Sequence, residues 1–215
     1  MIHKIINGSY KKVASMYGDN RMDTLKAIFN RIKADPDNIQ FTRKKIEPLY
    51  YAASSAKILI IGQAPGEKAQ KTMIIWNDPS GIRLREWMGV SDDTFYHSGK
   101  IAVLPMDFYF PGKGKHGDLP PRADFASQWH QQLIKAMPDV KLTLLVGSYA
   151  QRYYLKTGSK QTLTQVVKHY RNYLPNYFPL VHPSPRNNIW MKKNPWFEEE
   201  VLPDLKMHIH QILSR

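Results

Sequence analysis

The sequence predicts an α/β fold, a three-layer αβα sandwich built on a short, mainly parallel sheet of four strands. Four apolar runs, at residues 57–61, 101–105, 142–147 and 177–181, have the length and continuous hydrophobicity of strands that are buried on both faces. Segments with apolar residues at helical spacing separate these runs, as in successive βαβ units. Hydrophobic residues make up 42% of the 215 residues, so the chain can form a substantial core.

The composition favours a single domain spanning residues 1–215. No apolar run approaches the roughly 18 residues of a transmembrane helix, and the first residues lack a signal-peptide pattern. We therefore expect a cytoplasmic monomer with no membrane partner. The chain has no cysteine, which excludes disulfides, thiolate nucleophiles and cysteine-ligated metal centres. We expect no metal and no other cofactor.

The chain is strongly basic. Its 31 Lys and Arg residues exceed its 18 Asp and Glu residues, which gives a formal net charge of +13. The basic residues gather at 43–45, 113–115, 152–160 and 168–171. Clustered positive charge is typical of nucleic-acid-binding domains, so nucleic acid is the expected partner. The alternative interpretation is a protein whose lysines are scattered over a solvated surface.

The first fifty residues are predicted to be a peripheral helical part of the domain. Apolar residues recur at helical spacing across residues 25–32, after Asp23, which is a suitable N-cap. The sequence Asp-Pro-Asp at residues 35–37 ends this helix. We assign the segment to packing.

The first strand, at residues 57–61, leads into the loop Gly-Gln-Ala-Pro-Gly at residues 62–66. Its glycines let the backbone turn sharply and bring its N–H groups close to a flat ligand. A helix is predicted over residues 82–88, with Asp78 or Ser80 as its N-cap and Gly89 at its end.

The second strand is followed by Asp107 and three aromatic residues. Residues 111–122 contain three glycines together with Lys113 and Lys115, and predict a mobile, solvent-facing polar loop. A helix follows over residues 123–137. The third strand then ends in a turn at Gly147, after which Ser148 is expected to cap the next helix.

The fourth strand runs directly into the loop His-Pro-Ser-Pro-Arg-Asn at residues 182–187. Two prolines stiffen this loop and prevent a strand or helix from continuing. It carries an imidazole (His182), a hydroxyl (Ser184) and a guanidinium (Arg186) within five residues. The alternative is a Pro-rich turn whose histidine caps a local backbone group. The last helix is predicted to start at residues 194–196, Asn-Pro-Trp.

The Gln63 loop, Asp107, the Gly147 turn and the His182 loop all follow predicted parallel strands, whose carboxyl ends form one crevice. The sequences at 62–66 and 182–187 resemble the two signature motifs of the uracil-DNA glycosylase superfamily, and the resemblance spans roughly residues 57–215. The first motif is most similar to the iron–sulfur branch, whose cluster cysteines are absent here. The second is most similar to the single-strand-selective branch.

The resemblance implies a DNA glycosylase of base excision repair, which cleaves the N-glycosidic bond of a flipped-out base, most of all uracil. His182 would donate to the carbonyl oxygen of the departing base, and the backbone N–H of Gln63, beside Ala64, would hold the same edge. Trp76 would stack on the base, unless it is a core tryptophan. The expected DNA contacts are Ser184, Arg186, Asn187, Lys113 and Lys115.

This chain also departs from the family pattern. Ala64 stands where the most active relatives carry an Asp or Asn that orients water, so we expect Asp78 to supply the carboxylate unless it is only a helix N-cap. The Asn that contacts the imide edge of the base in relatives is missing, so Asp107 or the backbone must contact that edge here. Gly66 replaces a selective Tyr, which predicts loose selectivity that extends to hypoxanthine or xanthine.

Three other functions remain open at this level. The first is a lesion-binding or nucleic-acid-binding module on the same fold with weak or no catalysis, which Ala64 favours. The second is an enzyme that acts on RNA or a free nucleotide. The third is an unrelated hydrolase that uses Ser184 as its nucleophile.

Overall fold

The computed structural model of the protein describes residues 20–115, 117–158 and 161–214. A four-stranded sheet forms its centre, and all neighbouring strands of this sheet run parallel. In spatial order the strands are β2 (Ile101–Val103), β1 (Ile58–Ile61), β5 (Leu142–Val146) and β6 (Tyr177–Leu180). Each strand falls within one of the four apolar runs. The predicted α/β class with a short parallel sheet is therefore confirmed.

The sheet is buried on both faces because successive side chains of a strand point to opposite sides. In β1, Ile58 and Ile60 belong to one core cluster, whereas Leu59 and Ile61 belong to the other. All four side chains are at most 1% exposed. A continuous apolar run is thus what a central strand between two helical layers requires.

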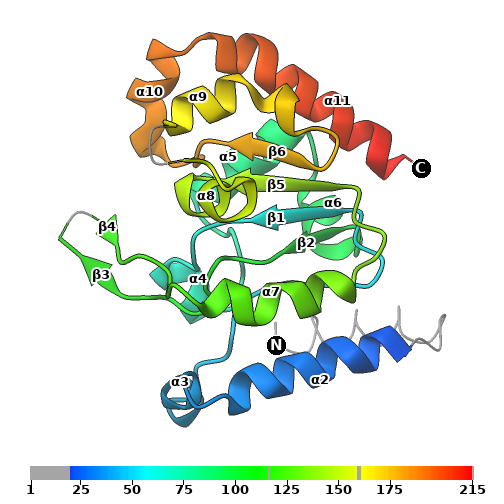
Figure 1. The fold of residues 1–215 in the computed structure, drawn as a ribbon, viewed down its shortest axis with the longest axis vertical. Coiled ribbons are helices and arrows are strands. Elements are labelled where there is room, and N and C mark those ends of the chain that lie inside the picture. Colours follow the sequence, from blue (N-terminus) through cyan, green and yellow to red (C-terminus); the bar gives the residue numbers. More distant parts are fainter. Residues whose placement is uncertain (1–19, 116, 159–160, 215) are drawn as a thin grey trace.

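Helices on the two faces complete the three layers (Figure 1). One core cluster receives side chains from α4 (Glu67–Thr72), α5 (Pro79–Met88), α6 (Asp92–His97), α9 (Leu163–Lys168) and α11 (Leu202–Leu213). The other receives side chains from α2 (Asn20–Ala34), α7 (Phe125–Lys135) and α8 (Ser148–Leu155). The helical part predicted for residues 1–50 contains α2 and α3 (Ile39–Arg43), and its residues 1–19 lie outside the described residues.

The strand order fixes where a ligand site can form. From β1 the chain moves to β2 on one side, and β5 and β6 are then added on the other side. Open α/β sheets bind ligands at the carboxyl ends of their strands, where the direction of winding switches. In Figure 1 the arrowheads of the sheet point left, toward α10 (Asn188–Lys193) and the hairpin of β3 (Lys113–Gly114) and β4 (Gly117–Asp118).

The segment predicted as an irregular polar loop, residues 111–122, instead contains a short β-hairpin. Strand β3 (Lys113–Gly114) pairs antiparallel with β4 (Gly117–Asp118), and the backbone N–H of Leu119 donates to the carbonyl of Gly112. Gly112 and Gly117 have φ of +101° and +146°, values that L-residues with side chains rarely adopt. The glycines that we interpreted as signs of a loop therefore allow the turn of a β-hairpin. Lys113 and Lys115 of this segment are exposed to solvent, as predicted.

Two helices start at short polar side chains that cap them. The carboxylate of Asp78 accepts the backbone N–H of Gly81 at 2.9 Å, so Asp78 is the N-cap of α5. Ser91 caps α6 in the same way, by accepting the N–H of Thr94 at 3.1 Å. Both are residue types whose short polar side chains satisfy free N–H groups at helix starts.

Other starts differ from the prediction. Helix α2 begins at Asn20, before the expected cap Asp23. Gly147, with φ of +86°, occupies the N-cap of α8, so the prediction that Ser148 caps this helix is wrong. The last helix begins later than expected, because Trp196 rather than Asn194 is the N-cap of η3 (Phe197–Val201), a π-helical turn that continues into α11.

Candidate active site

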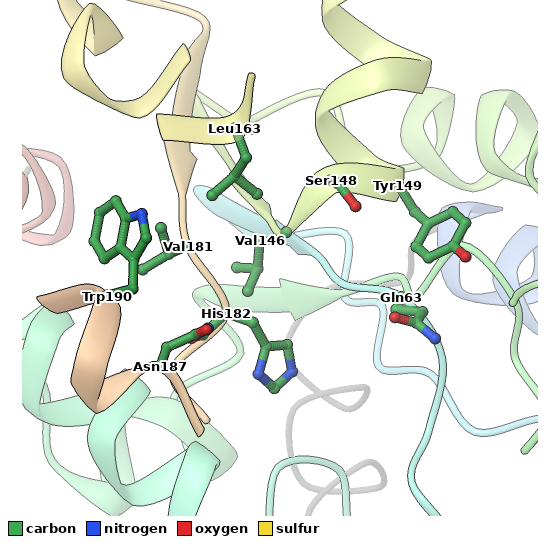
Figure 2. A pocket seen from close by; sticks show the side chains of 10 residues that line it. Gln63, Val146, Ser148, Tyr149, Leu163, Val181, His182, Asn187 and Trp190 are labelled. Atoms are coloured by element: carbon green, nitrogen blue, oxygen red, sulfur yellow. The ribbon is translucent and has the colours of Figure 1, made fainter. Parts of the chain in front are cut away.

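A pocket of about 210 Å³ lies at the carboxyl ends of β1, β5 and β6 (Figure 2). Segments that are far apart in the sequence form its wall. The lining residues are Gln63, Val146, Gly147, Ser148, Tyr149, Leu163, Val181, His182, Asn187 and Trp190. The structure therefore brings the two motif loops together, as the parallel topology predicts for strands that end at the same edge.

The hydrogen bonds around His182 define which nitrogen of its ring carries the proton. The backbone N–H of Ser184 donates to Nδ1 at 3.1 Å. Because a backbone N–H can only donate, Nδ1 must present its lone pair, and the neutral ring keeps its proton on Nε2. Burial lowers the pKa of this imidazole below its ordinary value of 6.5, while the carboxylates of Asp78 and Asp118 act in the opposite direction. His182 is thus a neutral Nε2–H donor at the pocket.

Internal bonds hold the His182 loop in one shape. The side-chain amide of Asn187 donates to the carbonyl of His182 at 2.7 Å. The hydroxyl of Ser184 accepts the N–H of Arg186 at 3.2 Å and caps the short helix η2 (Pro185–Asn187). From α5, Arg83 donates to Oδ1 of Asn188 at 2.8 Å. Ser184 and Asn187, which we expected at the DNA, are therefore also the residues that stiffen this loop.

The side chain of Gln63 is directed to the hairpin. Its Nε2 donates to the backbone carbonyl of Leu119 at 3.1 Å. The backbone carbonyl of Gln63 accepts the N–H of Asp107 at 3.2 Å. The ion pair between Lys113 of β3 and Glu67 of α4 is a second contact between the hairpin and the segment that follows β1. At its other end the hairpin approaches Arg186, because a Cβ placed on Gly117 would lie 3.4 Å from the guanidinium. The hairpin thus connects the Gln63 loop with the His182 loop.

Trp76 lies beside the imidazole of His182, with ring centroids 5.5 Å apart and planes inclined by 35°. Its indole also faces Gly62, where an added Cβ would lie 3.4 Å from Cζ2. The backbone of Trp76 is left-handed, with φ of +55°, and its carbonyl accepts hydrogen bonds from Arg85 and Tyr96, both at 3.1 Å. The ring is half-buried and packs against the core, as the alternative interpretation of Trp76 expected, and its stacking on a base stays a prediction.

Four residues that we expected at the site do not line this pocket in the part of the chain that the structure describes. They are Ala64, Trp76, Asp78 and Asp107. Ala64 is half-buried and has no polar group to offer. The carboxylate of Asp78 caps α5, although it is close enough to His182 to influence that pKa.

Asp107 has a structural role that its place in the sequence did not reveal. Its side chain is 2% exposed and forms a two-pronged ion pair with Arg122, at 2.7 and 2.8 Å. It also accepts the backbone N–H groups of Tyr109 and Arg122. Both of its oxygens are thus engaged within the protein, which leaves the carboxylate without a free acceptor for a ligand in the pocket.

Sequence reasoning missed several residues of the pocket wall. Ser148 and Tyr149 follow the Gly147 turn; the sequence suggested only a helix cap for Ser148 and no role for Tyr149. Leu163 and Trp190 come from α9 and α10, and no local pattern marks them as pocket residues.

Among the residues that the structure describes, no group of three His, Asp or Glu side chains could hold a metal ion. None of the helices within the described residues is long and apolar enough to span a bilayer.

Comparison with protein-family models gives one match that includes both motif loops and most of the sheet region. Residues 48–206 match the model described as the uracil DNA glycosylase superfamily. The matched segment covers well over half of the chain and contains β1, β2, β5 and β6. The chain therefore belongs to the uracil DNA glycosylase superfamily.

Proposed function

We propose that this protein is a monofunctional DNA glycosylase of base excision repair that hydrolyses the N-glycosidic bond of a flipped-out base, with uracil as the leading substrate. Membership of the superfamily supports a DNA glycosylase-like function and DNA as the partner. The observation that carries the proposal is His182, a neutral Nε2–H donor on a stiff loop, which shares one pocket with Gln63.

In the proposed reaction the base departs with its bonding electron pair. Positive charge then develops on the sugar, and negative charge develops on the carbonyl oxygen of the base. His182 donates Nε2–H to that oxygen, and the backbone N–H of Gln63 holds the same edge. A fixed donor of this kind contributes about 3–4 kcal/mol to the stability of a transition state. Trp76, whose ring lies beside His182 and near Gly62, stacks on the flipped ring in this proposal.

Water is the nucleophile in this proposal, because neither motif loop contains a lysine that could form a Schiff base. Its oxygen bonds to C1′ of the sugar as the C1′–N bond breaks, and the proton that water loses ends on the departing base. Asp78 is the carboxylate that would orient the water and face the developing positive charge. One of its oxygens caps α5, and an ionised carboxylate has further lone pairs available for a second partner.

The test is cleavage of a uracil-containing oligonucleotide, followed by alkaline strand scission at the abasic product. We expect excision by the wild type and a loss of about 10²–10³-fold in the single-turnover rate of His182→Ala, the usual effect of removing one fixed donor. His97→Ala, at an exposed histidine on α6, is the matched control and should keep the wild-type rate. A wild type that leaves uracil, hypoxanthine and xanthine intact in this assay contradicts the proposal.

Two substitutions separate the possible roles of Asp78. Asp78→Ala removes both the carboxylate and the cap, whereas Asp78→Ser keeps a capping oxygen and loses only the charge. If Asp78 orients water, both variants excise uracil slowly, while only Asp78→Ala loses about 1 kcal/mol of stability. Full excision by Asp78→Ser would restrict this residue to helix capping.

A second candidate function, favoured by specific observations, is a lesion-binding module that has lost the chemistry. Ala64 offers no carboxylate, and the carboxylate of Asp107 is engaged with Arg122. The two functions differ in one measurement. Tight binding of a uracil-containing duplex without any abasic product, at enzyme in excess and over hours, would favour the binding module.

A further inference from the structure

The β3–β4 hairpin holds a carboxylate, Asp118, between the two motif loops. The residue before it, Gly117, lies beside the His182 loop, because a Cβ added there would be 3.4 Å from the guanidinium of Arg186. The residue after it, Leu119, accepts a hydrogen bond from the side chain of Gln63 at 3.1 Å through its backbone carbonyl. The chain on either side of Asp118 therefore contacts one loop of the site each, and Asp118 itself is exposed.

The charge of Asp118 acts on the imidazole of His182. Burial lowers the pKa of His182, and the carboxylates that act against burial are Asp78 and Asp118. Exposed charges more than about 10 Å apart are largely screened by salt, so such an effect requires a carboxylate close to the ring. Asp78 comes from the start of α5 and Asp118 from the hairpin. Two elements that are distant in the sequence thus each bring one carboxylate to His182.

The carboxylates near the strand ends differ in how many of their lone pairs are already used. Asp107 has both oxygens engaged within the protein, and Asp78 accepts the N–H of Gly81 with one oxygen. Within the described part of the chain, the side chain of Asp118 has no hydrogen bond and no ion pair. Its partner in the hairpin ladder, Lys113, pairs with Glu67 instead. Asp118 is therefore the carboxylate with both oxygens free for a ligand.

The proposed reaction has a use for a free carboxylate. The attacking water must lose a proton, and Ala64 has no group that could accept one. A general base needs a free lone pair at the reaction centre, within reach of the proton that it takes. Asp118 has free lone pairs beside His182, which is the donor to the departing base in the proposed function.

We propose that Asp118 is a second catalytic carboxylate of the site, the group that accepts the proton of the attacking water. This inference rests on the proposed function and adds the hairpin to the catalytic machinery. The C1′–N bond breaks and its electron pair leaves with the base. A lone pair of the water oxygen forms the bond to C1′, and an oxygen of Asp118 takes the proton that the water loses. The base anion then regains that proton through solvent, while Asp78 orients the water and faces the sugar.

The experiment measures single-turnover excision of uracil together with the affinity for the uracil-containing oligonucleotide. Asp118→Asn keeps the size of the side chain but cannot take a proton, so the rate should fall by about 100-fold. Its affinity for DNA should be unchanged or higher, because a negative charge near the phosphates is removed. Formate should restore part of the rate to Asp118→Ala, since it supplies a free carboxylate at an exposed position. Asp139→Asn, at an exposed residue in the turn before β5 and thus at the opposite edge of the sheet, is the matched control.

A second measurement needs no DNA. The pKa of His182, followed by NMR, should be lower in Asp118→Asn than in the wild type, because a nearby negative charge is lost, and Asp139→Asn should leave it unchanged. An unchanged pKa in Asp118→Asn overturns the proposal.

The kinetic outcomes separate this inference from the proposed function. If the wild type excises uracil and Asp118→Asn does so at the same rate, Asp118 is not catalytic and the glycosylase proposal stands. A rate and an affinity that fall together, without rescue by formate, show a structural role and overturn the inference alone. A wild type that excises no base overturns both.

Discussion

At the scale of single residues, the protonation state of His182 is the property on which the proposed chemistry depends. The N–H of Ser184 fixes Nδ1 as an acceptor, and burial keeps the ring neutral. A charged ring would have to give up this bond, since a protonated Nδ1 can only donate. The same short loop therefore sets both the position and the tautomer of the imidazole.

This arrangement predicts a pH dependence. Because the pKa of His182 lies below 6.5, the neutral donor is present at pH 6.5 and above, and it is lost as the pH falls through the lowered pKa. Single-turnover excision should therefore hold its plateau down to about pH 6.5 and decline in more acidic solution. Excision that falls as the pH drops from 8 to 7 would show that the active ring is not the buried neutral form.

At the scale of elements, the site depends on how closely α5 approaches the preceding turn. A Cβ on Gly81 would lie only 1.7 Å from the carbonyl oxygen of Trp76, so the helix can start there only with glycine. Arg85 of the same helix then donates to that carbonyl. Helix α5 thus holds Trp76 in its left-handed conformation beside His182.

Two glycine substitutions test this dependence. Gly81→Ala should cost at least about 3 kcal/mol of stability, the upper range for an overpacked site, and should raise KM because the Trp76 turn moves. Gly66→Ala is the matched control, since nothing lies within 4 Å of its added Cβ and its φ of −71° suits alanine. Equal stability of the two variants in urea unfolding would contradict the close approach.

At the scale of the whole molecule, a buried histidine couples global stability to pH. His130 is 2% exposed, donates Nε2–H to the carbonyl of Pro105 at 2.8 Å and accepts the hydroxyl of Tyr154 at Nδ1. Burial is the main cause that lowers its pKa to about 4. This histidine links α7 and α8 to the segment that follows β2.

The expected sign follows from proton binding. Between pH 6.5 and 4, His130 binds a proton in the unfolded chain but stays neutral in the folded protein. Acid therefore lowers the free energy of unfolding, by about 3 kcal/mol across that range. Urea unfolding of the wild type should show this loss, and His130→Gln should have a flatter profile from a lower starting stability. His97→Gln, at an exposed position, should keep the wild-type slope.

The net charge of +13 predicts that DNA binding depends strongly on salt. If about five phosphates are neutralised, log K should fall with log salt at a slope of about −4 to −5. Lys115→Ala and Lys192→Ala each remove one exposed cation and should reduce the slope by about 1 if that cation contacts a phosphate. Binding that is unaffected between 50 and 200 mM salt would exclude a phosphate-dominated interface.

The sequence by itself determined the sheet and the two motif loops. Continuous apolar runs bounded by glycine or proline are local signals, and the parallel topology then requires residues 63 and 182 to meet at one edge. The capping role of Asp78 was one of two interpretations that its neighbours allowed.

Only the tertiary structure decided which polar groups remain free at the site. Asp107 is paired with Arg122, Gln63 with Leu119, and Arg83 with Asn188. Each partner lies 15 or more positions away along the chain, beyond the reach of periodicity and capping rules.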